Sequence, residues 1–231
     1  MTIRVPQSTR LEIKFASYDI HSDMILHWLR VHPACFITPY PSRSVNNVYF
    51  DTHDYAAFSE NLFGSSSRTK VRYRWYGEEQ GPAVGVLEIK FKRNYFGWKT
   101  RYKIASPPYQ RGFSWRSIRR EMLEHLPLEG KQWLNANPVP ALINRYHRKY
   151  FVSSDQKIRA TIDTKQAVWD QRFWAHPNFR RRANLPETLV VEFKFERKDR
   201  NMASEVLQGF PIRVSRHSKY INGIRAISER S

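Results

Sequence analysis

The stretch from residue 68 to residue 76, RTKVRYRWY, constrains this chain most, because cationic and uncharged side chains alternate along it. In an extended strand, successive side chains point to opposite faces. One face therefore carries a row of cations, Arg68, Lys70, Arg72 and Arg74. Like charges in one row repel one another, so something must neutralise them. Three interpretations are open: a strand face in water, a strip that binds nucleic acid, or a lining for a chain of phosphates.

The overall charge points to an anionic partner. The 231 residues carry a formal net charge of +18, which favours nucleic acid, anionic lipid or phosphate-rich small molecules as ligands. Hydrophobic residues make up 41% of the chain and aromatic residues 14%, which indicates a folded domain rather than a disordered chain. We expect one domain over residues 1–231, because the same style of strand recurs from end to end.

The cysteine count and the lack of long apolar runs bear on where the protein is expected to act. The chain has one cysteine, Cys35, so no disulfide can form within it, and a lone cysteine is usually a small buried hydrophobic residue. The first residues contain no apolar segment of signal-peptide length. No apolar run approaches the length of a membrane span. We therefore expect a soluble cytoplasmic protein.

The periodicity of the apolar residues predicts both strands and helices. The predicted strands are 10–15, 45–51, 68–76, 85–93, 98–104, 141–152, 158–164, 189–195 and the short 211–214. The predicted helices are 19–31, 53–63, 114–126, 201–207 and 215–227. Pro138 and Pro140 indicate a linker, and 170–187 a basic, aromatic loop.

Most predicted strands have one charged face and one apolar face, and the charged faces are rich in cations. A succession of antiparallel strands with few sharp hairpins favours a barrel or a pair of sheets. Helices with apolar stripes can cover the strands from outside, which leaves the charged faces to line the inside. A barrel of about eight strands has room for one narrow ligand. We predict an α+β fold, an antiparallel β-barrel tunnel with peripheral helices; the alternative is an amphipathic sheet with its polar face in water.

Common catalytic motifs are missing from the sequence. It contains no HExxH segment, no paired CxxC segments and no Walker-type glycine loop. What remains is many cations and a few acids, among them Glu12, Glu88, Asp163 and Glu192. That inventory suits phosphoryl transfer, in which a protein mainly positions phosphates and offsets their charge, with help from a divalent metal.

Eight segments in sequence order resemble the VTC domain, the family of polyphosphate polymerases related to the CYTH proteins and the triphosphate tunnel metalloenzymes. The segments are Arg10-x-Glu12-x-Lys14, VYFDT (48–52), RTKVRYRWYG (68–77), LEIKFKR (87–93), YHRKYF (146–151), IRATIDT (158–164), VVEFKF (190–195) and SKYINGI (218–224). The resemblance implies a β-barrel tunnel of the triphosphate tunnel type and Mn²⁺ or Mg²⁺ as cofactor. It implies a phosphotransferase that moves the γ-phosphate of ATP onto a growing polyphosphate chain inside the tunnel.

The resemblance also implies roles for individual residues. The implied catalytic cations are Lys14, Arg72, Arg74 and Lys219. The implied substrate-binding residues are Lys90, Lys99, Tyr146, Arg148, Arg159 and Ser218. The implied metal ligand is Glu192. CYTH relatives carry a glutamate two positions before Glu12, where this chain has Arg10; the loss of one metal ligand fits the polymerase branch better than the hydrolase branch.

Rival functions remain open at this point. The same scaffold can hydrolyse tripolyphosphate or nucleoside triphosphates, or bind polyphosphate without catalysis. The expected partners are ATP and inorganic polyphosphate, with no membrane segment in this chain and no prediction of oligomeric state. Nucleic acid is disfavoured, because a groove-binding protein usually puts its cations on one exposed element, whereas these occupy alternating rows on many strands.

Several residues also have a purely structural interpretation. Glu12 and Asp163 can simply pair with neighbouring cations, and Asp51 can cap the helix that follows it. The aromatic residues expected in the core outside the barrel are Tyr49, Phe50 and Trp75.

Overall fold

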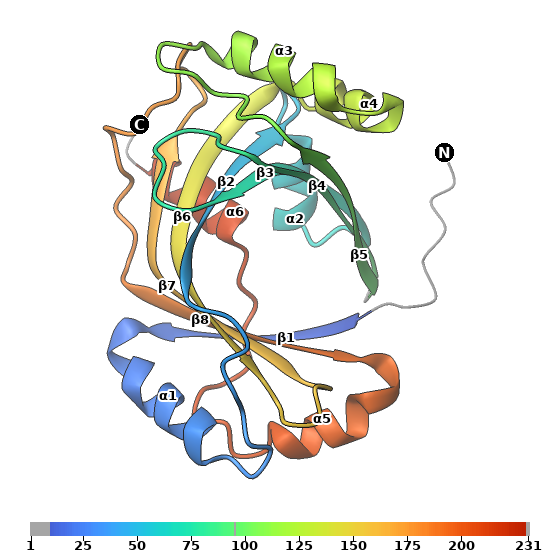
Figure 1. Cartoon of the computed structure of the whole chain (residues 1–231), viewed down its shortest axis with the longest axis vertical. Helices are drawn as coiled ribbons and strands as arrows, with labels where there is room; N and C mark the ends of the chain where they lie inside the picture. Colours follow the sequence, from blue (N-terminus) through green and yellow to red (C-terminus); the bar gives the residue numbers. More distant parts are fainter. Residues whose placement is uncertain (1–9, 95, 230–231) are drawn as a thin grey trace.

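An antiparallel sheet of eight strands dominates the computed structural model, which describes residues 10–94 and 96–229 (Figure 1). The strands are β1 (Arg10–Tyr18), β2 (Arg43–Asp51), β3 (Ser67–Tyr76), β4 (Gly85–Arg93), β5 (Phe96–Ile104), β6 (Val139–Val152), β7 (Arg159–Asp170) and β8 (Thr188–Glu196). They pair in the order β1-β8-β7-β6-β2-β3-β4-β5. All the longer strands that the alternation predicts are therefore present.

Six α-helices accompany the sheet within the described residues. They are α1 (Ser22–Val31), α2 (Ala56–Leu62), α3 (Trp115–His125), α4 (Leu128–Ala136), α5 (Arg200–Val206) and α6 (Lys219–Ser228). None of these described helices is long and apolar enough to cross a membrane.

The sheet curls until its two edges approach each other. Glu12 on β1 and Lys90 on β4 lie 3.8 Å apart, although five strands separate β1 from β4 in the pairing order. Such a contact requires both side chains to point to the concave side. Strands β1 and β5 are the two edges of the sheet. Over the described residues, no backbone hydrogen-bond ladder joins these two edges, and side chains make the contact across the gap. The predicted α+β fold, an antiparallel tunnel with peripheral helices, is confirmed.

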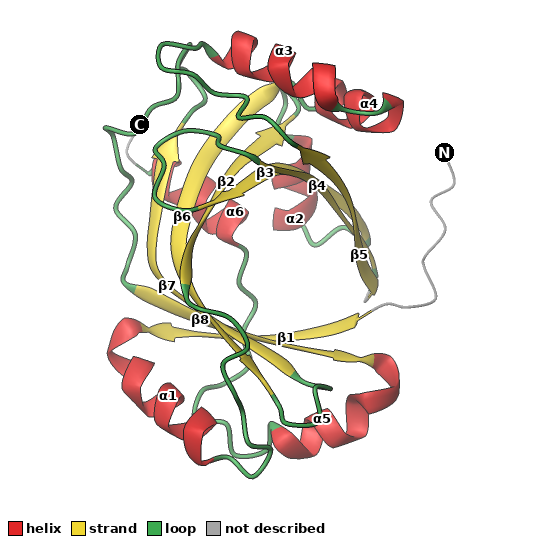
Figure 2. Ribbon diagram, viewed as in Figure 1, coloured by secondary structure: helices red, strands yellow, loops and turns green. Residues whose placement is uncertain are grey.

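One convex apolar core joins β2, β3 and β4 to α3 and α4, which lie across the outside of the curl (Figure 2). Trp75 of β3 and Met122 of α3 are both fully buried in this core. Helix α3 begins after Ser114, whose hydroxyl accepts a hydrogen bond from the backbone N–H of Ser117 at 3.2 Å. Phe50 belongs to the same core, so Phe50 and Trp75 occupy the predicted outer position.

A second convex core joins β1, β7 and β8 to α1 and α5. Phe15 and Phe193 meet edge to face, with ring centroids 5.8 Å apart, and Leu29 of α1 is fully buried in the same core. Burial of one such side chain stabilises the fold by about 1.5–3 kcal/mol. The two outer cores therefore hold the apolar faces outward and leave the charged faces on the concave side.

Helices α2 and α6 lie on the concave side of β2 and β6 (Figure 1). Tyr220 of α6 stacks on Tyr49, with ring centroids 5.0 Å apart, and Tyr49 pairs across the ladder with Arg72. The prediction that Tyr49 lies in the outer core is therefore wrong. Its position along β2 has opposite parity to that of Phe50, so the two rings leave the strand on opposite faces.

Three local predictions also differ from the structure. Helix α4 was not predicted; it starts after Pro127 without a side-chain cap, so the usual start signal is absent. Pro140 lies inside β6, opposite Phe50, where a β-bulge in the β2–β6 ladder accommodates it. Residues 211–214 form no strand: Val214 makes only an isolated bridge to Phe15.

Asp51 ties β2 to both concave helices. Its carboxylate accepts hydrogen bonds from the backbone N–H groups of Thr52, Ala57 and Phe58 at 2.8, 2.9 and 3.1 Å. The hydroxyl of Tyr220 donates to the same carboxylate, and Asp51 is fully buried. This confirms the structural interpretation, in which Asp51 caps the helix that follows it.

Replacing Asp51 by asparagine tests this junction. The amide nitrogen of Asn cannot accept a hydrogen bond, so Asp51→Asn leaves at least one buried donor unpaired. We expect the free energy of unfolding to fall by about 1–3 kcal/mol. Urea denaturation measures the loss, with the exposed Glu205→Gln as a matched control that we expect to stay within about 0.5 kcal/mol of wild type. Equal stability of the two variants would contradict the proposed junction.

Candidate functional site

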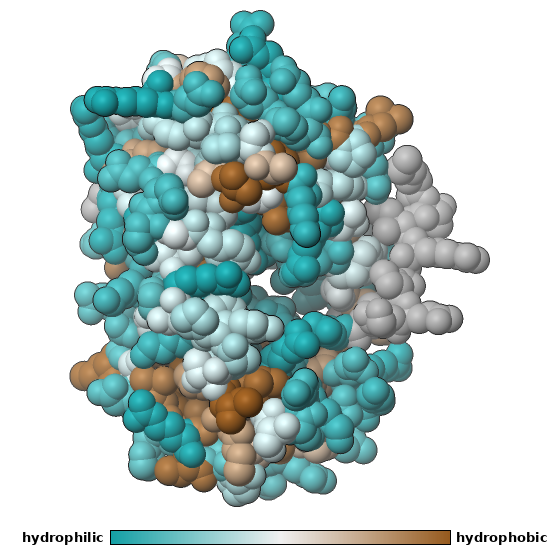
Figure 3. All heavy atoms as spheres, viewed as in Figure 1, coloured by the Kyte–Doolittle hydropathy of each residue, from teal (hydrophilic) through white to brown (hydrophobic). Residues whose placement is uncertain are grey.

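The concave face brings the charged rows of separate strands together. Arg72 on β3 pairs across the ladder with Glu88 on β4, and Glu88 pairs with Arg101 on β5. Lys14 on β1 pairs in the same way with Glu192 on β8. The curl turns these rows toward one another. Figure 3 shows the molecule hollowed between its upper and lower halves, with mostly hydrophilic residues around the hollow.

Glu88 is the centre of the first charged group. Its carboxylate lies 2.5 Å from Arg72, 3.0 Å from Arg101, 3.4 Å from Lys99 and 3.5 Å from Arg74, and only 2% of the residue is exposed. Burial raises the pKa of Glu88, but Arg72 and Arg74 outweigh it and hold that pKa far below the usual value. Glu88 therefore stays ionised and fixes the cations around it.

Uncharged side chains also fix the orientation of the Arg74 guanidinium. Its Nε donates to Asn47 Oδ1 at 2.8 Å, and its Nη2 donates to the hydroxyl of Tyr146 at 3.2 Å. Asn47 is held in turn by Asn144, to which its amide donates at 2.8 Å. The guanidinium plane thus has a fixed orientation, which a lysine ammonium at the same place cannot reproduce.

Two glutamates and two lysines form the second group. Lys14 Nζ lies 3.0 Å from Glu12 and 3.1 Å from Glu192. Lys194 Nζ lies 2.6 Å from Glu192 and 3.7 Å from Glu12. Burial raises the pKa of Glu12, but Lys90 and the other lysines bring it down to about 2. Burial likewise raises the pKa of Glu192, and Lys194 and Lys14 hold it well below the usual value. Glu12 therefore does pair with neighbouring lysines, as its structural interpretation expects.

Asp163 organises the third group. The guanidinium of Arg148 contacts its carboxylate at 2.5 and 2.7 Å, and Lys219 Nζ does so at 2.6 Å. Burial raises the pKa of Asp163, but Arg148 and Lys219 outweigh it and lower that pKa. The ring of Tyr146 faces both cations, at 5.2 Å from Arg148 and 4.6 Å from Lys219. Lys219 is the first residue of α6, so the start of that helix places an ammonium group beside the charged side chains of the sheet.

Excess positive charge remains on this face. Burial, opposed by Glu88 and assisted by Arg101, lowers the pKa of Lys99 to about 8. Glu12 raises the pKa of Lys90, but burial and the charge of Lys14 outweigh it, and the pKa falls to about 8. Both ammonium groups therefore lose their protons at a lower pH than an ordinary lysine does. A bound polyanion would relieve the repulsion and raise both pKa values.

Two of the residues predicted from sequence lie toward the edge of this arrangement. Arg159 is exposed at the start of β7, opposite Lys194 in the ladder. Ser218 precedes α6 and caps it, since its hydroxyl accepts from the backbone N–H of Ile221 at 3.3 Å. The same hydroxyl accepts a hydrogen bond from Lys70 Nζ at 3.0 Å.

The sequence assigned no site role to Glu88 or Asn47, although both position arginines. The signal for Glu88 is its parity with Lys90 along β4, which places both on one face. No comparable signal marks Asn47, because its role depends on the pairing of β2 with β3.

The described residues contain no cluster of three or more His, Cys, Asp or Glu that could hold a metal ion. Glu12 and Glu192 nevertheless share Lys14 and Lys194, so their carboxylates are neighbours. Mg²⁺ is commonly bound by one or two carboxylates, together with waters and substrate phosphates. The pair of glutamates fits such an ion, provided that phosphate supplies further oxygen ligands.

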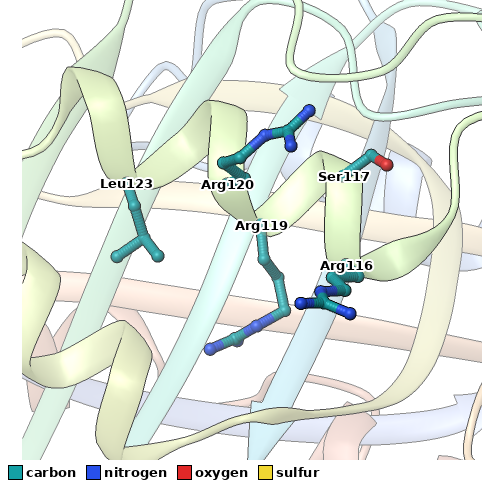
Figure 4. Close-up of a pocket in the computed structure, with 5 residues that line it drawn as sticks. All are labelled: Arg116, Ser117, Arg119, Arg120 and Leu123. Atoms are coloured by element: carbon teal, nitrogen blue, oxygen red, sulfur yellow. The ribbon is translucent and has the colours of Figure 1, made fainter.

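A surface cavity of about 410 Å³ lies elsewhere, on helix α3 (Figure 4). Its lining residues are Arg116, Ser117, Arg119, Arg120 and Leu123. Arg119 is already engaged there, because its guanidinium donates to the backbone carbonyls of Leu134 and Asn137. None of the predicted site residues lines this cavity, so it is separate from the concave face.

The fold has counterparts among solved structures. A candidate adenylate cyclase from Vibrio parahaemolyticus superposes with a TM-score of 0.51 and 11% identity, over 94% of this chain and 98% of that chain. The PH1819 protein from Pyrococcus horikoshii OT3 gives 0.48 and 10% identity, over 96% and 99%. A candidate adenylyl cyclase from Hippeastrum, HpAC1, described with a dominant triphosphatase activity, gives 0.48 and 12%, over 95% of each chain. At such identities the first likeness shows a shared fold and nothing more.

No protein of curated function matches the sequence significantly. The profile of the VTC domain, in contrast, matches residues 7–228. The match spans the whole described sheet and includes every residue of the three charged groups. The chain therefore belongs to the VTC domain family.

Proposed function

We propose that this protein is a metal-dependent polyphosphate polymerase, which transfers the γ-phosphate of ATP onto the end of a polyphosphate chain held on the concave face. Membership of the VTC domain family and a cation-lined triphosphate tunnel support a phosphate-handling enzyme. One observation favours a polymerase in particular. The carboxylates at the centre of the concave face are all bound to cations and have lowered pKa values; they are Glu12, Glu88, Asp163 and Glu192.

A carboxylate that is held ionised by cations is a poor general base, because efficient proton transfer needs a pKa near the working pH. Near this face, burial and the charges of Lys219 and Lys14 lower the pKa of His217 to about 4, so its imidazole is a weak base as well. Hydrolysis needs a water to lose a proton. The terminal oxygen of a polyphosphate chain is already anionic and needs no base. The site therefore suits a phosphate acceptor better than water.

The proposed reaction is one displacement at phosphorus. The chain's terminal oxygen forms a bond to the γ-phosphorus, the bond from that phosphorus to the β–γ bridging oxygen breaks, and ADP leaves with the bonding electrons. Charge accumulates on the transferred group and on the leaving oxygen. Catalysis then consists of positioning and electrostatic stabilisation, which fixed cations supply.

Arg72 and Arg74 are the residues proposed to hold the transferring phosphate. They stand two positions apart on β3, so both point to the concave side. Arginine presents a planar fork that matches phosphate oxygens, whereas lysine is a point charge. Lys14 and Lys219 approach from β1 and α6. The residues proposed to bind the rest of the substrate are Lys90, Lys99, Tyr146, Arg148, Arg159 and Ser218.

Glu192, with Glu12 beside it, is proposed to hold the divalent ion, Mn²⁺ or Mg²⁺. When bound, the ion would offset phosphate charge as the lysines do, and would orient the phosphate oxygens. Glu192 itself keeps Lys14 and Lys194 in place, at 3.1 and 2.6 Å.

The assay that tests this function incubates the purified protein with ATP and Mn²⁺ and separates long polyphosphate from free phosphate. We expect polymer from wild type. Arg74→Lys keeps the charge but loses the oriented fork, and a misplaced reacting group can cost about a hundredfold in rate. We therefore expect that variant to lose about that factor, while Arg120→Lys on α3, an exposed control, turns over like wild type.

Free phosphate in place of polymer would instead assign a triphosphatase activity to the same scaffold. Wild-type turnover in Arg74→Lys would show that only the number of charges matters, as expected for a polyanion-binding surface.

A manganese titration tests the role given to Glu192. Glu192→Gln keeps the shape and removes the charge that a divalent ion requires. We expect the half-saturating Mn²⁺ concentration to rise by about tenfold or more, since altering even the groups behind a metal ligand costs about 10–100-fold in affinity. Glu196→Gln, four positions along the same strand and exposed, is the control. The same manganese dependence in both variants would remove Glu192 from the metal site.

A further inference from the structure

The cation row of β3 is neutralised over only half of its length. Arg72 and Arg74 reach Glu88, at 2.5 and 3.5 Å. Arg68 and Lys70 form no ion pair with any carboxylate of the described residues. Among the residues that the structure describes, Lys70 has one hydrogen-bond partner, the hydroxyl of Ser218 at 3.0 Å.

Further cations surround this half of the row. Lys92 stands directly opposite Arg68, and Lys90 directly opposite Lys70, in the β3–β4 ladder. Burial, followed by the charges of Lys90 and Lys14, holds the pKa of Lys70 well below its usual value. The pKa of Lys92 is lowered by burial and by Arg68, with a further contribution from Arg216. Four cations therefore share one end of the concave face, and no carboxylate within residues 10–94 and 96–229 is paired to any of them: Arg68, Lys70, Lys92 and Arg216.

Two features indicate that this end of the face awaits a ligand. The Nε of Arg68 is buried and has no hydrogen-bond partner in the described part of the chain, a state that costs free energy in a folded protein. On β5, the residue opposite Lys92 is Gly97, and an added Cβ there would meet nothing closer than a backbone oxygen at 3.7 Å. Gly97 thus presents no side chain beside Lys92 on this edge strand.

We infer that Arg68, Lys70, Lys92 and Arg216 form a second subsite, which binds a segment of the polyphosphate chain away from the transferring phosphate. This inference rests on the proposed function. The four residues continue the row that contains Arg72 and Arg74, so one linear polyanion can follow it. Their unneutralised charge is what such a chain would supply, because each phosphate unit brings an anionic oxygen.

Distance sets the length of chain that reaches both subsites. Arg68 and Arg74 are six residues apart on β3, which corresponds to about 20 Å at roughly 3.3 Å per residue. A chain of three linked phosphates is much shorter than that. Tripolyphosphate bound at the arginine pair therefore leaves Arg68 and Lys92 without a partner, whereas a long chain contacts both subsites at once.

Equilibrium binding at one fixed ionic strength tests the second subsite. Isothermal titration compares long-chain polyphosphate with tripolyphosphate, without ATP, for wild type and for the double variant Arg68→Gln/Lys92→Gln. We expect wild type to bind the long chain more tightly than tripolyphosphate. In the double variant, we expect the ratio of the two affinities to fall by about tenfold or more, because the loss of hydrogen bonds to charged groups changes a binding constant by that factor. The control is Arg93→Gln, which removes one charge from the exposed neighbour of Lys92 on the opposite face of β4.

The outcomes separate this inference from the proposed function. Binding of neither ligand by folded wild type would overturn both. Normal binding with no preference for the long chain, or an equal loss of preference in Arg93→Gln, would overturn the second subsite alone. A single-stranded oligonucleotide serves as a second probe. If Arg68 and Lys92 raise its affinity as much as they raise that of polyphosphate, nucleic acid replaces polyphosphate as the ligand of this subsite. Lys92→Gln alone, at an exposed position, gives the same test if the double variant does not fold.

Discussion

The repulsion among cations on the concave face is the constraint on which the rest of this structure depends. Curling the sheet brings rows of lysine and arginine toward one another, and carboxylates that stand between them offset much of this repulsion. Glu88, Asp163 and the pair Glu12 and Glu192 fill that role, each at ion-pair distance from at least two cations. Removing one partner of such a buried pair leaves an uncompensated charge and is strongly destabilising.

The outer helices make this arrangement possible. Apolar side chains on the convex face pack against α3 and α4 at one side and against α1 and α5 at the other, so hydrophobic burial drives the curl. Helix α6 then closes the concave side, where Lys219 meets Asp163 and Tyr220 meets Asp51. The scaffold and the site are thus joined by a few side chains whose removal affects both.

Much of this fold follows from alternation along the sequence. Period-two patterns predict the strands and the face that each side chain occupies, including the row with Arg72 and Arg74. Helix α4 is missed because Pro127 offers no side-chain cap, and Tyr49 is misplaced because an aromatic ring suggests the outer core. The contact of Glu12 with Lys90 is beyond sequence reasoning altogether. It depends on how far the sheet curls, which the packing of distant helices decides.

The central claim is that the concave face, and no other surface, holds the phosphate chain. A crystal structure of the protein soaked with tripolyphosphate tests it most directly. The account predicts phosphate oxygens within hydrogen-bonding distance of Arg72 and Arg74, with Lys14 or Lys219 on the opposite side of the ligand. Tripolyphosphate bound at the arginines of α3 (Figure 4), with the concave face free of it, would contradict the account.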